Sequence, residues 1–298
     1  METFSAAWLA LREPADDMAR SSPLVALVAE ALDRRPGTAT SIFDLGSGAG
    51  SNLRYLLPRL GPSQHWHLLD HDASLLHVAV ARTRDWASGA GLDVRPDAHG
   101  LTLGRGSRRA IVTTRPCDLA QLDAAVFRSS DGGATLVTGA ALLDLTSPGW
   151  MDGLAARCAD AGAVVLFALT YDGRIACDPV DPGDEDVRVL VNRHQRTNKG
   201  FGEAAGPDAT AAAAEHFRAH GYVMHRAKSD WRLEPDAAAL QHELVDGWAH
   251  AAADMARQDR PAILAWRDRR LAHIDAGRSH IVVGHEDLAG WPEDRVAT

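Results

Sequence analysis

The stretch SIFDLGSGAGSN, residues 41–52, has the spacing of a ligand-binding turn. Its acid, Asp44, ends an apolar run, and Gly46, Gly48 and Gly50 follow at alternate positions. Glycine lets the backbone adopt φ > 0 and approach a ligand closely. Because a helical pattern comes next, the stretch predicts a strand, a glycine-rich turn and a helix. At the carboxyl edge of a parallel sheet such a turn binds nucleotide-like ligands, toward which helix N-terminal amides point.

Two kinds of ligand compete for this turn. A dinucleotide turn has the spacing G-x-G-x-x-G or A, and counting from Gly46 places Ser51 at the third position. Asp44 would repel a pyrophosphate, but it suits a cationic ligand. S-adenosylmethionine, which carries an ammonium and a sulfonium, is therefore favoured over a dinucleotide.

The stretch resembles motif I of the class I S-adenosylmethionine-dependent methyltransferases. In that family an acid at the end of the second strand binds both ribose hydroxyls, and HWHLLDHD supplies Asp70 there. The family often has an acid or amide after the third strand, near the adenine amino group. TTRPCDLAQ supplies Asp118, with Leu119 as an adenine neighbour.

The motifs and the resemblance together imply ten cofactor-binding residues. They are Asp44, Gly46, Ser47, Gly48, Gly50, Asn52, Asp70, His71, Asp118 and Leu119. Three of these have an alternative role: Asn52 and Asp118 could cap the helices that follow them, and His71 could be a surface residue.

Candidates for the chemistry lie after the fourth and fifth predicted strands. Methyl transfer is an in-line displacement that needs a base only if the acceptor carries a proton. Asp144, in ALLDLTS, is a candidate base or acceptor ligand, although it could instead cap the next helix. His194, in VNRHQRTNKGFG, is a candidate base near neutral pH.

The basic residues around His194 predict an anionic acceptor, because Arg and Lys bind carboxylate and phosphate groups. The alternative is a solvated basic loop. The candidate acceptor-binding residues are Tyr171, Asn192, Arg193, Arg196 and Lys199.

Strands that alternate with helices predict an α/β fold with a mostly parallel sheet. Strands are expected at 41–45, 65–70, 110–116 and 163–171, with another beginning at 134. Ser22 is expected to cap a helix over 22–37. The resemblance implies a Rossmann-like sheet flanked by helices, ending in an antiparallel hairpin of 222–231 and 279–288.

We predict one domain over residues 1–298. Its parts are an N-terminal helical cap (1–40), a cofactor-binding core (41–170), an insertion that forms an acceptor-binding loop (171–210), and a C-terminal part with a helical insertion (211–298). Trp248 and Trp266 are expected in the core or at a homodimer interface.

Composition limits the classes of partner. The net charge of −9 gives no support for a nucleic-acid or membrane partner. The three cysteines are far apart, and no metal site is predicted. No export signal or membrane-spanning run is found, so we expect a cytoplasmic location.

The leading hypothesis is methyl transfer to a small, soluble, anionic acceptor. A protein or RNA acceptor is the second hypothesis. A nicotinamide-dependent oxidoreductase or a non-catalytic nucleotide-binding module is the third.

Overall fold

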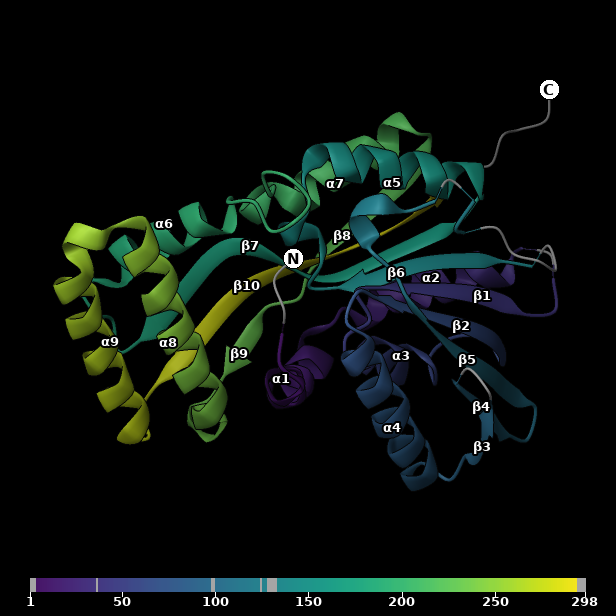
Figure 1. Ribbon diagram of the computed structural model, residues 1–298, viewed down its shortest axis with the longest axis horizontal. Helices are drawn as coiled ribbons and strands as arrows, with labels where there is room; N and C mark the ends of the chain where they lie inside the picture. Colours follow the sequence, from purple (N-terminus) through teal and green to yellow (C-terminus); the bar gives the residue numbers. More distant parts are fainter. Residues whose placement is uncertain (1–3, 36, 98–99, 124, 128–132, 294–298) are drawn as a thin grey trace.

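Parallel strands form the centre of a large mixed sheet in the computed structural model, which describes residues 4–35, 37–97, 100–123, 125–127 and 133–293 (Figure 1). The strand order is β3-β4-β5-β2-β1-β6-β7-β10-β8, with β9 paired to β10. The central strands β5, β2, β1, β6 and β7 pair in parallel. Their bounds are β1 Thr40–Leu45, β2 Ser63–Asp70, β5 Arg108–Pro116, β6 Thr135–Ala140 and β7 Val164–Asp178.

Antiparallel strands complete both edges of the sheet. β10 (His280–Pro292) pairs with β7, with β8 (Tyr222–Lys228) and with β9 (Trp231–Leu233). The predicted mostly parallel sheet with a C-terminal antiparallel hairpin is therefore confirmed. The sequence analysis missed the hairpin of β3 (Asp93–Asp97) and β4 (Gly100–Arg105) at the other edge. β3 is short and mostly exposed, so it lacks the apolar alternation that identifies a strand.

Helices cover both faces of the sheet. The bounds are α1 Ala6–Ala19, α2 Ser22–Asp33, α3 Ser51–Leu56, α4 Ala73–Gly89, α5 Pro148–Asp160, α6 Asp184–Gln195, α7 Ala209–Ala219, α8 Ala238–Met255 and α9 Arg260–Asp275. Apolar residues of α2, α3 and α4 pack on one face, and those of α5 and α7 on the other. The α2 cap is Ser21 and not Ser22, since the Ser21 hydroxyl accepts the Leu24 amide.

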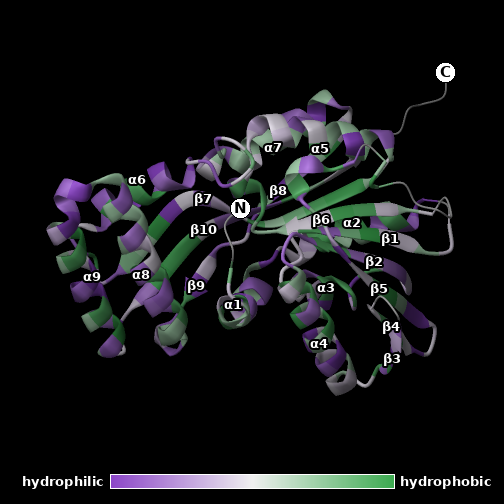
Figure 2. Ribbon diagram, in the orientation of Figure 1, coloured by the Kyte–Doolittle hydropathy of each residue, from purple (hydrophilic) through white to green (hydrophobic). Residues whose placement is uncertain are grey.

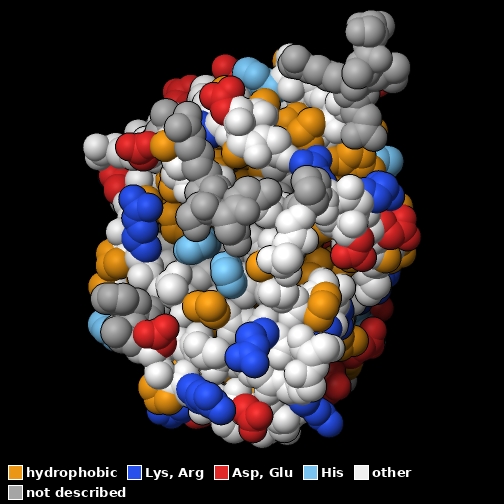
Figure 3. All heavy atoms as spheres, turned by 90° about the vertical axis from the view of Figure 1, so that its right-hand side faces the viewer, with side chains coloured by type: hydrophobic (Ala, Val, Ile, Leu, Met, Phe, Trp, Pro, Cys, Tyr) orange, Lys and Arg blue, Asp and Glu red, His pale blue; other side chains and the backbone are white. Residues whose placement is uncertain are grey.

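Side-chain polarity follows these layers. Figure 2 shows hydrophobic residues concentrated along the central strands, whereas the outer helices alternate between hydrophobic and hydrophilic residues. On the side of the molecule that Figure 3 shows, acidic and basic side chains are interspersed.

β7 and β10 run well beyond the core sheet. β6 pairs with β7 only as far as Ala168, whereas β7 continues to Asp178 with β10 as its partner. The outer parts of these two strands, together with β9, α6, α8 and α9, form a second lobe, which we call the extension (Figure 1, left). α1 lies between the core and the extension.

The predicted irregular loop over 171–210 is therefore wrong for much of its length, because β7 and α6 occupy 171–178 and 184–195. α6 is mostly polar and buries only Val187 and Val191, which lie on one face, so its apolar signal is small. Its helical signal is instead electrostatic: acids fill the first turn, and Arg193 and His194 lie in the last.

Trp266 in α9 is 2% exposed, and its indole donates to Asp184 at 2.8 Å. Trp248 is also buried. Trp248 and Trp266 were expected either in the core or at a homodimer interface, and the structure places both in the core of the chain itself.

A β-bulge marks the point where β7 and β10 leave the core. Ala168 and Leu169 lie opposite the single residue Asp287, and Leu169 has φ of 57°. The Asp287 carboxylate accepts the Leu169 amide at 2.8 Å and the Ser21 amide at 2.7 Å. Asp287 is 1% exposed, so it joins the bulge to the cap of α2 without water between them.

We expect Asp287→Ala to lower the free energy of unfolding by about 2–5 kcal/mol, because two buried amides lose their acceptor. Urea denaturation measures this change. Asp254→Ala, at an exposed position in α8, is the matched control and should change stability by about 0.5 kcal/mol or less. Equal stability of the two variants would contradict the role given to Asp287.

Candidate functional site

The three glycines after β1 all adopt the left-handed backbone that the sequence analysis required. Their φ angles are 63° at Gly46, 49° at Gly48 and 80° at Gly50. Gly46 and Gly48 line a cavity, whereas Gly50 caps α3 and does not line it. A Cβ at Gly50 would lie 3.2 Å from the Ala79 Cβ and 3.1 Å from the Arg54 guanidinium. Gly50 therefore permits the packing of α3 on α4.

Asp70 lies at the end of β2, beside the turn. One carboxylate oxygen accepts the Gly48 amide at 2.8 Å, and the other accepts the Asp72 amide at 2.9 Å. The His71 imidazole is 3.3 Å from the second oxygen. Both oxygens are thus fixed at the cavity wall, and the oxygen that accepts the Gly48 amide retains a lone pair for a further donor.

Asp44 is fully buried beneath the turn and does not line the cavity. It accepts the Asn52 amide at 2.7 Å, and the Asn52 oxygen accepts from Arg20 at 2.6 Å. Asn52 itself lines the cavity, so Asp44 acts through it. Burial raises the pKa of Asp44 to about 7, although the Asn52 hydrogen bond and the Arg20 charge lower it.

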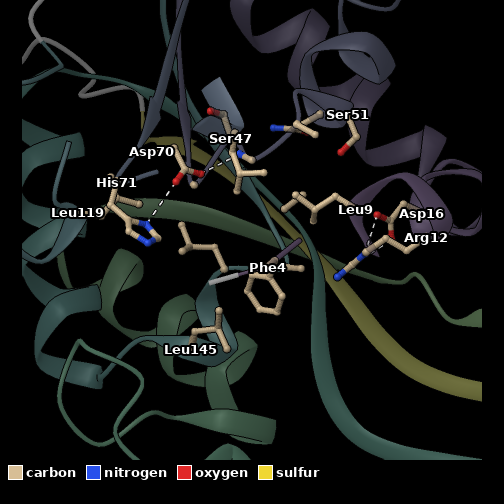
Figure 4. A pocket seen from close by; sticks show the side chains of 18 of the residues that line it. Phe4, Leu9, Arg12, Asp16, Ser47, Ser51, Asp70, His71, Leu119 and Leu145 are labelled. Carbon is tan, nitrogen blue, oxygen red and sulfur yellow. Dashed lines mark hydrogen bonds and ion pairs between the residues drawn. The ribbon is translucent and has the colours of Figure 1, made fainter. Parts of the chain in front are cut away.

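The first cavity lies between the glycine turn and α1. In Figure 4, Asp70, His71 and Leu119 lie at one end and Arg12 and Asp16 at the other. Phe4 and Leu9 lie between the two ends and cover the turn, with Leu9 close enough that a Cβ at Gly48 would lie 3.0 Å from its Cδ1. α1 therefore forms the roof of this cavity.

Seven of the ten predicted cofactor-binding residues line the first cavity. They are Gly46, Ser47, Gly48, Asn52, Asp70, His71 and Leu119. Asp118 does not line it: its carboxylate accepts the Ala120 amide at 3.0 Å and caps a single 3₁₀ turn, Leu119–Gln121. The capping role that the sequence analysis left open for Asp118 is thus present.

A second cavity, of about 450 Å³, adjoins the first. The two share Phe4, Arg12, Ala141, Leu145 and Lys199 in their walls. The second is enclosed by α1, α6, α8 and the strands of the extension. Its aromatic wall consists of Phe4, Trp8, Tyr171, Trp231 and Trp248.

Four of the predicted catalytic and acceptor-binding residues line the second cavity: Asp144, Tyr171, His194 and Lys199. The Lys199 ammonium lies 3.3 Å from His194 Nδ1. Asp144 does not cap α5, because Ser147 does so, and that alternative is therefore wrong.

The other three predicted acceptor-binding residues lie outside both cavities. Asn192 is behind Tyr171, whose hydroxyl donates to it at 2.7 Å. Arg193 is exposed, and Arg196 pairs with Asp208 at 2.8 Å. In a helix, residues three or four apart share a face, and the C-terminal end of α6 turns these arginines away from the cavity.

The sequence analysis missed several residues that line the cavities. Arg12 was not singled out, although its spacing to Asp16 is that of an i, i+4 ion pair. His285 lies within an apolar strand and carried no motif. Only the pairing of β10 with β7 brings it beside Tyr171, with ring centroids 6.2 Å apart.

Among the described residues, no group of three or more His, Cys, Asp or Glu side chains is placed to hold a metal ion. In the same part of the chain, no helix is both long and apolar enough to cross a bilayer.

No protein-family model matches this chain, and no curated protein matches it. The solved structures that it resembles include S-adenosylmethionine-dependent methyltransferases. One, from Geobacter sulfurreducens in complex with S-adenosylhomocysteine, is 16% identical, with a TM-score of 0.43 and coverage of 98% of this chain and 100% of that one. The cyclopropane synthase MmaA2 from Mycobacterium tuberculosis is 13% identical, with a TM-score of 0.46 and coverage of 96% and 94%.

The phosphoethanolamine N-methyltransferase 2 of Haemonchus contortus is 13% identical, with a TM-score of 0.43. That match covers 96% of this chain but only 57% of the Haemonchus chain. These three likenesses all have identities of 16% or less and TM-scores of 0.46 or less. At such identities and TM-scores, they assign neither an acceptor nor a role for any residue.

The raised pKa of Asp44 predicts a pH-dependent stability. The pKa of Asp44 is about 7 in the folded protein and near 3.8 in the unfolded chain. Between these two pH values the folded protein keeps the carboxyl proton while the unfolded chain has lost it, so the free energy of unfolding falls as the pH rises from 3.8 to 7. Asp44→Asn keeps an oxygen for the Asn52 amide but does not titrate. Urea denaturation should show the variant gaining about 2–3 kcal/mol relative to wild type between pH 5 and pH 8. A difference that is constant with pH would show that Asp44 titrates normally.

Proposed function

We propose that this protein transfers a methyl group from S-adenosylmethionine to a small acceptor bound in the second cavity. The observation that carries the proposal is the shared wall of the two cavities. A ligand on the glycine turn and a ligand among the aromatic residues would meet at Ala141, Leu145 and Lys199. Two ligands held in contact and in line are what a methyl displacement requires.

The residues of the first cavity fit the proposed cofactor. Asp70 offers a fixed carboxylate, which suits the ribose hydroxyls. Leu75 and Leu119 supply an apolar surface for an adenine. When bound, S-adenosylmethionine supplies a methyl group that is already activated by its sulfonium.

The chain's own residues orient this ligand and exclude water. Asn52, held by Asp44, Arg20 and Thr138, lines the same cavity. Phe4 and Leu9 line the cavity, and Leu9 approaches Gly48, so a ligand between the turn and these side chains would be shielded from part of the solvent. A drier site strengthens each electrostatic contact within it.

Basic groups support an acceptor that carries or develops negative charge. Arg12 and Lys199 lie in the wall that the two cavities share, in a chain whose net charge is −9. A local positive region can attract an anion that the whole molecule would repel. We place Asp144, Tyr171, His194 and Lys199 in contact with this acceptor, and we leave Arg193 and Arg196 out.

Calorimetry on Gly48→Val tests the proposal. A valine would resist φ of 49° and meet Leu9, so binding of S-adenosylhomocysteine should be lost while the protein stays folded. Gly149→Val is the matched control, because nothing lies within 4 Å of its Cβ position and its backbone is not left-handed. NAD is titrated in parallel. Wild-type binding of NAD in preference to S-adenosylhomocysteine would refute the proposal.

Alanine variants of Asp70 and Asp118 distinguish a carboxylate that contacts the cofactor from one that only caps a turn. We expect Asp70→Ala to weaken S-adenosylhomocysteine by roughly 30- to 1,000-fold, since lost charge-assisted contacts cost about 2–4 kcal/mol. Asp118→Ala should weaken it by less than about threefold, because that carboxylate caps a turn outside the cavity. The same titration measures both. A larger loss at Asp118 than at Asp70 would show that the cavity has been assigned to the wrong acid.

A further inference from the structure

His285 is an unexplained polar group in the second cavity. It lies in β10, it is 5% exposed, and it lines the cavity wall. Its Nδ1 has no hydrogen-bond partner among the described residues. That nitrogen is sealed inside the protein, so a ligand in the cavity can meet the ring only at its other atoms, among which Nε2 is the remaining ring nitrogen.

The surroundings of His285 are aromatic on both sides. Its ring centroid lies 5.0 Å from that of Trp231 and 6.2 Å from that of Tyr171. Trp8 and Trp248 line the same space. Walls of this kind pack against the faces and edges of a planar ring.

Burial keeps His285 neutral. Burial, followed by the positive charge of Arg12, lowers its pKa to about 4, against weaker opposing contributions from Asp16, Asp172 and a hydrogen bond with the Val283 backbone. Asp230 accepts the His285 backbone amide at 3.2 Å. The ring therefore offers a nitrogen lone pair at neutral pH. The cation that lowers its pKa would also stabilise an oxyanion nearby.

We propose that His285 accepts the hydroxyl proton of a planar aromatic alcohol, the class of acceptor that the second cavity binds. This inference rests on the proposed function and names its substrate class. The phenolic oxygen would lie between His285 and the shared wall of the two cavities, with Arg12 beside it. In the balanced step, the oxygen–methyl bond forms as the sulfur–methyl bond breaks. The hydroxyl proton passes to the imidazole and returns from there to water.

His285 suits this role better than His194. The His194 Nδ1 lies 3.3 Å from the Lys199 ammonium, which competes for its lone pair. His194 and Lys199 instead flank the cavity from the α6 side, where they can contact other parts of the acceptor.

The test uses phenol and anisole, which differ in that anisole has no hydroxyl donor. S-adenosylhomocysteine is titrated first, and each probe is then titrated into the loaded protein by calorimetry. The ratio of phenol to anisole affinity should be about three- to tenfold higher in wild type than in His285→Phe. His285→Asn, which keeps an acceptor oxygen, should restore part of this ratio. His225→Phe, outside the cavity and stacked on Trp291, should leave it unchanged.

A measurement on the wild type guards against a misfolded variant. In protein with ¹⁵N-labelled histidine, the ring nitrogen signals of His285 should shift on addition of phenol and stay in place with anisole. Failure of S-adenosylhomocysteine to bind would refute the proposed function itself. If it binds, two results overturn the inference on His285: equal phenol-to-anisole ratios in wild type and His285→Phe, or no binding of either probe.

Discussion

The carboxylate of Asp287 is the contact on which the arrangement of the two lobes depends. It accepts amides from Ser21 and Leu169, so the start of α2, the bulge of β7 and the strand β10 meet at one buried group. The Leu169 amide, displaced from the regular ladder by the bulge, finds its acceptor in this carboxylate. The bulge redirects β7 and β10 out of the core sheet and toward the extension. The second cavity lies where β7 and β10 leave the core sheet, and Leu169 of the bulge lines it.

Backbone strain is concentrated at the same edge. Among the described non-glycine residues, Ala141 and Leu169 have positive φ, 51° and 57°, and both line the second cavity. Each is held by a backbone hydrogen bond: Ala141 donates to Ala168 at 2.9 Å and Leu169 to Asp287. Left-handed conformations of such residues cost about 1–3 kcal/mol and persist only where surrounding contacts fix them. The strained residues of the described chain therefore lie in the wall of the second cavity.

The sequence predicted the half of the site that local patterns encode. Alternate glycines, an acid ending β2 and apolar strands each leave a signal within a few residues, and Gly48, Asp70 and the central strands were found in this way. The acceptor side depends on contacts between distant segments. Pairing of β10 with β7 places His285, which no spacing could reveal. The basic stretch around Arg196 was given one role, although the helix divides it into a cavity side and a solvent side.

α1 contributes one charged residue, Arg12, to the walls of both cavities. Arg12 donates from Nε and Nη2 to the two Asp16 carboxylate oxygens, each at 3.0 Å, and stacks over Trp231 at 4.8 Å, while the Trp231 indole donates to the same Asp16. The guanidinium lines both cavities and lowers the pKa of His285. If the Arg12 guanidinium moved toward a ligand in either cavity, it would lose its hydrogen bonds to Asp16 or its stacking on Trp231. Anything that displaces α1 therefore alters the cofactor end and the acceptor end together, because one ion pair stabilises both walls.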